Sequence, residues 1–233
     1  MSKAKTQILV AGLIMLVILL IDQWIKIYIK THFVLHESYK VTSWFYLSFV
    51  ENKGMAYGMQ LGSKALLTGF RIFAVVLFLY YLVRKVIRNE SPWLFVVLMS
   101  MMISGALGNI VDCVFYGQWF TSSVGQVAQW ADPSMGLMPN AAWFHGPVVD
   151  MLYFPLIRFD WPEWIPCAGQ TVHFITDFEW PDWLPCSDEP FLFFKPVFNF
   201  ADSCITVSTV SLLLYFAIGT YKASKNKKQH AIQ

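Results

Sequence analysis

Four long runs of apolar residues divide the chain, and most polar residues lie between them. The runs cover residues 8–29, 65–83, 93–114 and 200–221. Each is close to the ~20 residues that a helix needs to cross the hydrocarbon core of a bilayer. The first run starts like a signal peptide, but no small-residue cleavage site follows it and the apolar residues continue. The pattern therefore predicts four membrane-spanning helices, the first of them uncleaved.

The composition agrees with a membrane protein. The chain of 233 residues is 56% hydrophobic and only 14% charged, with a mean hydropathy of +0.49, whereas a soluble domain is about one quarter charged. Its net charge of +2 is too small to suggest a nucleic-acid partner. We expect one membrane-embedded domain over residues 1–233.

Basic residues predict the orientation of the helices. They precede the first run, fill the short turn between the second and third, and follow the fourth. These residues are Lys3, Lys5, Arg84, Lys85, Arg88, Lys222, Lys225, Lys227 and Lys228. Short cytoplasmic segments carry an excess of lysine and arginine. Both termini are therefore expected in the cytoplasm, and residues 31–64 and 115–199 on the outer side.

The first outer segment carries a strand pattern. Residues 39–49 alternate, with Tyr, Val, Ser, Phe, Leu and Phe at the odd positions, which predicts one strand. Aromatic residues lie on both of its faces, as suits a sheet that rests on lipid headgroups. Residues 52–58, which contain two glycines, are predicted to form a turn.

The second outer segment contains an internal repeat. Residues 159–167 are echoed by residues 178–186, with six of nine positions identical and a Trp-Pro-acid-Trp unit in each copy. Tryptophan favours the headgroup layer, so the repeat is either an interfacial element or an insertion that packs on itself. Cys167 and Cys186 occupy matching positions, and a disulfide between them is plausible outside the cytoplasm, although spacing alone does not fix a pairing.

Ionisable and amide residues gather at one predicted depth, the outer boundary of the membrane. They lie in the last turns of the first and third helices, before and in the first turn of the fourth, and on an outer loop. They are Asp22, Gln23, Lys26, Asn109, Asp112, Asp150, Asn199 and Asp202. Ionisable groups near hydrocarbon are costly and usually functional. Two carboxylates at such a boundary, Asp150 and Asp202, can share one proton, as in an aspartic protease.

Each of these residues also has a structural interpretation. Lys26 can extend its ammonium group to the interface, or pair with Asp22 one turn earlier. Asp202 can be an acid favoured by the dipole at a helix N-terminus, and Asp112 can cap a helix or pair. Taken one at a time, the residues leave these alternatives open.

Five short motifs follow one another along nearly the whole chain. They are Asp22-Gln23-x-x-Lys26, Asn52-x-Gly54-x-Ala56-Tyr57-Gly58, Gly105-Ala106-Leu107-Gly108-Asn109-x-x-Asp112, Val148-Val149-Asp150 and Phe198-Asn199-x-Ala201-Asp202-Ser203. With these motifs in this order and on these helices, the chain resembles the lipoprotein signal peptidases, the type II signal peptidases of bacteria.

The resemblance implies a fold and an activity. The fold would be α-helical, with four transmembrane helices, a small outer cradle of β-strands and, in this chain, a long outer insertion. The activity would be that of an intramembrane aspartic endopeptidase of the bacterial inner membrane, with its site at the outer face. It would cut a lipidated prolipoprotein just before the diacylglyceryl-cysteine.

The resemblance also assigns residues. Asp150 and Asp202 would form the catalytic pair. Positions that bind substrate or support the site would be Asp22, Lys26, Asn52, Gly54, Gly108, Asn109, Asp112, Asn199 and Ala201. Among them, the three asparagines can donate hydrogen bonds to the substrate backbone or to an oxyanion.

Cofactor and partner expectations follow. The histidines form no His-Glu-x-x-His motif and the cysteines no Cys-x-x-Cys motif, so we expect no metal and no other cofactor. The expected partners are lipidated prolipoproteins and membrane lipids, and the chain is expected to act as a monomer.

The chain departs from the family pattern in three places. Cys113 stands where the family usually has arginine, so its support must be lost or replaced, with Lys26 and Arg158 as candidates. Tyr57 stands where phenylalanine is usual. Residues 118–145 and the tryptophan repeat lengthen the outer segment, which bears on substrate access more than on the chemistry.

Two other functions share some of these features. A four-helix membrane thiol oxidoreductase would need a second outer cysteine pair, and residues 31–64 contain no cysteine. A small transporter would place its ionisable residues at mid-membrane, whereas here they collect near one face. Neither alternative accounts for the ordered motifs.

Overall fold

The computed structural model describes residues 2–52, 64–88, 90–167, 169–172, 178–179 and 191–230. Its helices are α1 (Lys3–His32), α2 (Lys64–Ile87), α3 (Trp93–Val111), α4 (Gly117–Trp119) and α5 (Phe200–His230), with a π-helical turn η1 (Asp112–Tyr116) and a 3₁₀ turn η2 (Pro133–Met135). Its strands are β1 (Ser38–Lys40), β2 (Tyr46–Asn52), β3 (Val148–Tyr153), β4 (Ile157–Phe159), β5 (Thr171–Val172), β6 (Phe178–Glu179), β7 (Phe191–Phe193) and β8 (Val197–Phe198).

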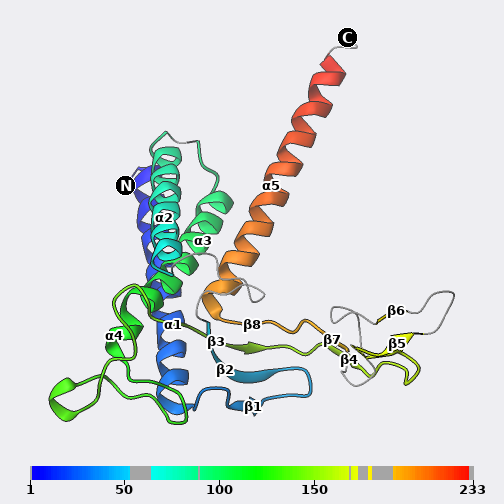
Figure 1. The fold of residues 1–233 in the computed structure, drawn as a ribbon. Coiled ribbons are helices and arrows are strands. Elements are labelled where there is room, and N and C mark those ends of the chain that lie inside the picture. Colours follow the sequence, from blue (N-terminus) through cyan, green and yellow to red (C-terminus); the bar gives the residue numbers. More distant parts are fainter. Residues whose placement is uncertain are drawn as a thin grey trace. The chain divides into compact units, whose positions relative to one another are not determined.

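The chain divides into two compact units. The first comprises Met1–Glu37, Phe49–Met151 and Phe198–Gln233, and the second comprises Ser38–Ser48 and Leu152–Val197. The first unit holds all of the long helices (Figure 1). The single domain expected over the whole chain includes both units and stays a prediction.

The prediction of four spanning helices is confirmed. Among the described residues, four helices are long and apolar enough to cross a membrane: Lys3–His32, Lys64–Ile87, Trp93–Trp119 and Phe200–Asn226. They are longer than the apolar runs, because hydrogen bonding along a helix continues into polar flanking residues until a cap or a turn ends it. The first begins at Ser2, whose side chain accepts from the backbone N–H of Lys5 at 3.4 Å.

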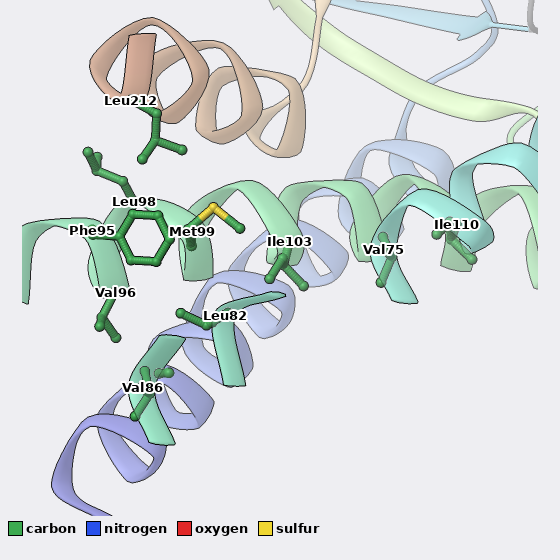
Figure 2. Close-up of a cluster of buried hydrophobic side chains, with 11 residues drawn as sticks. Val75, Leu82, Val86, Phe95, Val96, Leu98, Met99, Ile103, Ile110 and Leu212 are labelled. Atoms are coloured by element: carbon green, nitrogen blue, oxygen red, sulfur yellow. The ribbon is translucent and has the colours of Figure 1, made fainter. Parts of the chain in front are cut away.

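Helix α3 lies at the centre of the first unit and packs against α1, α2 and α5. Of its most apolar stretch, 61% is buried, against 11–17% for the other three helices. Figure 2 shows the apolar cluster around it, where Leu212 of α5 lies beside Leu98 and Met99, and Val86 of α2 lies on the side of Val96. The outward apolar surfaces of the other helices are what a bilayer would cover.

The C-terminal end of α3 changes pitch where the chain turns toward the site. Asp112 starts the π-helical turn η1, a distortion that occurs often at functional sites. Gly146, just before β3, donates its backbone N–H to the carbonyl of Cys113 at 2.9 Å. A Cβ at Gly146 would collide with the carbonyl of Asp112, so only glycine lets β3 start this close to η1.

Residues 39–49 do not form one strand, and that prediction was wrong. The chain makes a hairpin of β1 and β2, paired antiparallel with Tyr39 opposite Leu47. The backbone N–H groups of Val41 and Thr42 both donate to the carbonyl of Phe45, at 3.1 and 3.0 Å. One continuous strand would carry the same alternation, but the hairpin lets its two arms satisfy each other's backbone groups. The sheet runs in the order β1-β2-β3-β8.

The second unit is small and aromatic. Strands β4 and β7 pair antiparallel, as do β5 and β6, and the ring of Phe154 stacks on that of Phe45 with 4.8 Å between centroids. The tryptophan repeat falls here, and its second copy lies mostly outside the described residues. Cys167 is disulfide-bonded. Its predicted partner, Cys186, is outside the described residues, so the pairing stays a prediction.

Candidate active site

The candidate dyad is assembled from one strand and one helix of the first unit. Asp150 is the third residue of β3, and Asp202 lies in the first turn of α5. The side-chain amide of Asn199 joins them. Its Nδ2 donates to Oδ1 of Asp150 at 2.7 Å, and its Oδ1 accepts from the backbone N–H of Asp202 at 2.9 Å. The two aspartates are 52 positions apart in sequence and share one hydrogen-bond partner.

Asp202 is held at the start of α5 by a reciprocal capping pair. Besides the bond just described, Oδ2 of Asp202 accepts from the backbone N–H of Asn199 at 3.4 Å, as in a capping box. The other oxygen, Oδ1, accepts from Nδ2 of Asn109 on α3 at 2.7 Å. The structural interpretation of Asp202 as a helix-terminal acid is therefore correct, and it also fixes how the carboxylate faces the site.

Asp150 is the more enclosed of the two carboxyl groups. It is 3% exposed, whereas Asp202 is half-buried. Burial, followed by the negative charge of Asp202, raises the pKa of Asp150 to about 7. Hydrogen bonds donated by Asn199 and Asn52, together with the positive charge of Lys26, act in the opposite direction. An aspartate with such a pKa beside a second carboxylate can hold a proton near neutral pH.

Lys26 is the centre of the polar network, and its interpretation as a lysine reaching the interface was wrong. Its side chain has no exposed surface. Its Nζ lies 3.0 Å from Oδ2 of Asp22, 2.8 Å from Oδ2 of Asp112 and 2.9 Å from Oδ1 of Asn109. Three acceptors match the three donors of an ammonium group, so the buried charge is fully satisfied.

The two carboxylates paired with Lys26 hold the backbone next to the dyad. Oδ1 of Asp22 accepts from the N–H of Ala201 at 3.0 Å, and Oδ2 of Asp112 accepts from the N–H of Val149 at 3.3 Å. Ala201 and Val149 each immediately precede one of the candidate aspartates. One buried ammonium group therefore links the backbone positions of both members of the dyad.

Further polar and small residues complete this support. Gln23 donates to Oδ1 of Asp112 at 3.0 Å and accepts from the hydroxyl of Tyr116 at 3.0 Å. At Gly108 a Cβ would collide with the carboxylate of Asp22 and touch the Cβ of Ala201. The small residues at 108 and 201 are thus required for the close approach of α1, α3 and α5.

Two further positions of the family pattern are Gly54 and Cys113. Gly54 lies outside the described residues. Cys113, which stands where the family usually has arginine, is buried, and Nη1 of Arg71 on α2 lies 3.2 Å from its Sγ. Arg71 was not predicted to belong to the site, although an arginine inside a predicted span is itself a sign of function.

A second buried charged group was also missed. Lys30, Glu51 and Ser123 contact one another near the site. The sequence could have indicated Lys30, because it lies one helical turn after Lys26 and thus on the same face of α1. Nothing in the sequence pairs it with the other two residues. Within the described residues, no cluster of three or more His, Cys, Asp or Glu side chains could hold a metal ion.

Comparison with known proteins gives consistent results. Residues 14–218 match the family described as signal peptidase (SPase) II. A lipoprotein signal peptidase of Porphyromonas gingivalis is 45% identical over 207 residues, covering 89% of this chain and 82% of that protein. One from Amoebophilus asiaticus is 30% identical over 210 residues, covering 86% and 75%.

Two solved structures are similar in fold. Both are described as bacterial membrane enzymes determined by the in meso method. One has a TM-score of 0.54 at 19% identity and covers 91% of this chain and 89% of its own, and the other has a TM-score of 0.52 at 19% identity. At this identity the likeness concerns the fold alone. It agrees with four long apolar helices accompanied by a small antiparallel sheet.

Proposed function

We propose a reaction and a mechanism for this chain, which belongs to the signal peptidase II family. The chain removes the signal peptide from prolipoproteins by aspartic-protease chemistry, with Asp150 and Asp202 as the catalytic pair. The observation that carries this proposal is the hydrogen-bond network around Asn199. Its side-chain amide donates to the carboxylate of Asp150 and accepts from the backbone N–H of Asp202. Aspartic proteases depend on such a pair, because two close carboxyl groups retain one proton between them.

The mechanism follows from that shared proton. The ionised member takes a proton from water, which attacks the scissile carbonyl, and the protonated member polarises that carbonyl. The proton then passes to the leaving amine, and the two carboxyl groups exchange roles. The pKa of about 7 for Asp150 supports a singly protonated pair at neutral pH.

The asparagines have unequal capacity to bind substrate. Both N–H bonds of the Asn199 amide are used, one to Asp150 and one to Oδ1 of Asn109 at 3.2 Å. The amide of Asn109 donates to Asp202, and its second N–H has no acceptor among the described residues. We assign Asn199 to orienting the dyad, and the second N–H of Asn109 to the substrate backbone or the oxyanion.

The setting is a bacterial cytoplasmic membrane crossed by the four helices. Both termini lie in the cytoplasm and the dyad lies at the outer face, as the distribution of basic residues supports. The substrate is a prolipoprotein that carries a diacylglyceryl-cysteine, and cleavage occurs on the N-terminal side of that residue. The chain works as a monomer among membrane lipids, without nucleic acid.

The direct test is cleavage of a lipidated precursor by purified protein in liposomes, followed by mass spectrometry. D150N, D202N and the double variant should all be inactive, with the double variant no worse than either single one, because residues that act as a unit are not additive. E90Q, at an exposed ion pair with Lys85, is the control and should remain active. Near-normal turnover by D150N or D202N would overturn the dyad.

Inhibitors provide an independent test of the aspartic mechanism. Metal chelators and reagents directed at serine or cysteine should leave cleavage unchanged. The two cysteines of the first unit, Cys113 and Cys204, are buried. Inhibition by a low concentration of chelator that zinc reverses would contradict the proposed mechanism.

A further inference from the structure

A closed ring of three buried side chains lies outside the network around Lys26. Nζ of Lys30 is 2.5 Å from Oε1 of Glu51 and 3.0 Å from Oγ of Ser123. The hydroxyl of Ser123 in turn donates to the same Glu51 oxygen at 2.9 Å. Lys30 and Ser123 have no exposed surface, and the side chain of Glu51 is 4% exposed. Ser123 cannot meet a substrate there, so the ring is not a second nucleophilic centre.

The ring joins three segments that are distant in sequence. Lys30 is in the last turn of α1, Glu51 is in β2, and Ser123 belongs to the insertion over residues 118–145. The rings of Phe49 and Phe120, both fully buried, lie 6.0 and 5.6 Å from the ammonium group. In such apolar surroundings, loss of one partner leaves an uncompensated charge, so the three segments are held in one arrangement.

The strand in this ring also reaches the dyad. Asn52 follows Glu51 in β2, and successive side chains of a strand point to opposite sides. The side chain of Glu51 therefore turns toward Lys30, while that of Asn52 turns the other way and donates to the carboxylate of Asp150. A shift of β2 at residue 51 would move residue 52 as well.

We propose that Glu51 and Lys30 are positioning residues, which fix the end of β2 so that Asn52 reaches the catalytic carboxyl group. The proposal rests on the assignment of Asp150 to the dyad. It also gives the insertion a role, because Ser123 closes the ring from that segment. Glu51 and Lys30 act through Asn52 and contact neither the substrate nor the reacting atoms.

The test compares E51Q, N52A and the double variant in the liposome cleavage assay. E51Q keeps the shape of residue 51 and removes its charge. We expect kcat to fall roughly 10- to 100-fold, the loss that a displacement of about 1 Å can cause, with a smaller change in KM. In the N52A background, E51Q should cost no more than about 2-fold, because coupled residues are not additive.

The pH profile separates positioning from a merely structural role. The groups that face Asp150 are Asp202, Lys26, Asn199 and Asn52. Because the Asn52 bond favours the ionised form, its loss raises the pKa of Asp150. The high-pH limb of the rate profile should therefore move upward by a similar amount in N52A and E51Q. A structural ion pair would change the yield or stability of the protein and leave this limb in place.

Two further variants cover a failure of E51Q to fold. K30M/E51Q removes both charges together and leaves none unpaired, and S123A keeps the ion pair while losing its bridging hydroxyl. S123A should lower kcat and move the high-pH limb of the rate profile upward, as E51Q does, but by smaller amounts. The control is E90Q, which removes the exposed partner of Lys85, 2.9 Å away, and should change neither quantity.

The outcomes distinguish this inference from the proposed function. If D150N remained active, the assignment of Asp150 to the catalytic dyad, and with it the proposed function, would be wrong. Suppose instead that D150N is inactive, and that E51Q folds and keeps a normal kcat and an unchanged high-pH limb. That result would overturn the positioning role and leave the proposed function in place. Full additivity of E51Q and N52A would do the same.

Discussion

Replacement of Lys26 by methionine tests whether the buried network holds the fold together. The substitution keeps the length of the side chain and removes one charge. It takes the ammonium group away from Asp22 and Asp112, which are 1% and 0% exposed. Both carboxylates keep a backbone donor, Ala201 and Val149 respectively, but they lose their positive partner and face each other across the vacated space.

The expected loss is large. Removing one partner of a buried ion pair costs about 3–5 kcal/mol, because the remaining charge is left without compensation. Here one lysine serves two carboxylates, so we expect K26M to lie at the upper end of that range. A protein with a total stability of about 5–15 kcal/mol would lose a third or more of it.

The assay is equilibrium unfolding in detergent micelles by titration with SDS, followed by circular dichroism. The triple variant D22N/K26M/D112N removes all three charges together and should recover much of the stability lost in K26M, since no buried charge remains unpaired. K85M, at an exposed ion pair on another part of the first unit, is the control and should unfold like the parent protein. A K26M protein whose stability is within about 1 kcal/mol of the parent would show that the Lys26 network does not hold the fold together.

Three further predictions concern the pH dependence of cleavage, the packing at Gly108 and the tryptophan repeat. Cleavage should decline as the pH rises above about 7, because Asp150, whose pKa is raised to about 7, then loses the proton that the pair must retain; a rate that stays constant to pH 9 would contradict this. G108A should destabilise the protein by about 1–3 kcal/mol through overpacking, since its Cβ would meet the Asp22 carboxylate, whereas G12A, with nothing within 4 Å, should unfold like the parent. Replacing residues 159–186 with a short Gly/Ser linker should raise KM more than it lowers kcat if the tryptophan repeat guides a lipid-bearing substrate, and unchanged kinetics in membranes would leave a passive insertion.

Several features of the site could be predicted because they are local in the sequence. The four helices follow from runs of apolar residues, and their placement was confirmed to within a few turns. The start of α5 follows from the pattern of Asn199 and Asp202, which matches a capping pair. Motif order singled out the two candidate aspartates, although their catalytic roles stay predictions.

Other features were wrong or missed because they depend on contacts between distant residues. Alternation along residues 39–49 is the same for one strand as for two strands of a hairpin, so the pattern cannot distinguish them. Arg71, whose Nη1 lies 3.2 Å from Sγ of Cys113, was not among the residues expected to replace the support of the missing arginine. Of the two residues that were expected, Lys26 contacts Asp112. The side chain of Arg158 lies outside what the structure describes.

The segments that can cross a membrane and the residues that can carry protons follow from residue type and short-range spacing. Which polar groups meet depends instead on how the helices pack. The absence of a Cβ at Gly108 lets α3 approach Asp22, and that approach encloses Lys26 between two carboxylates where an isolated helix would leave it at the interface. A buried charge requires partners, but only the packing of the helices determines which residues supply them.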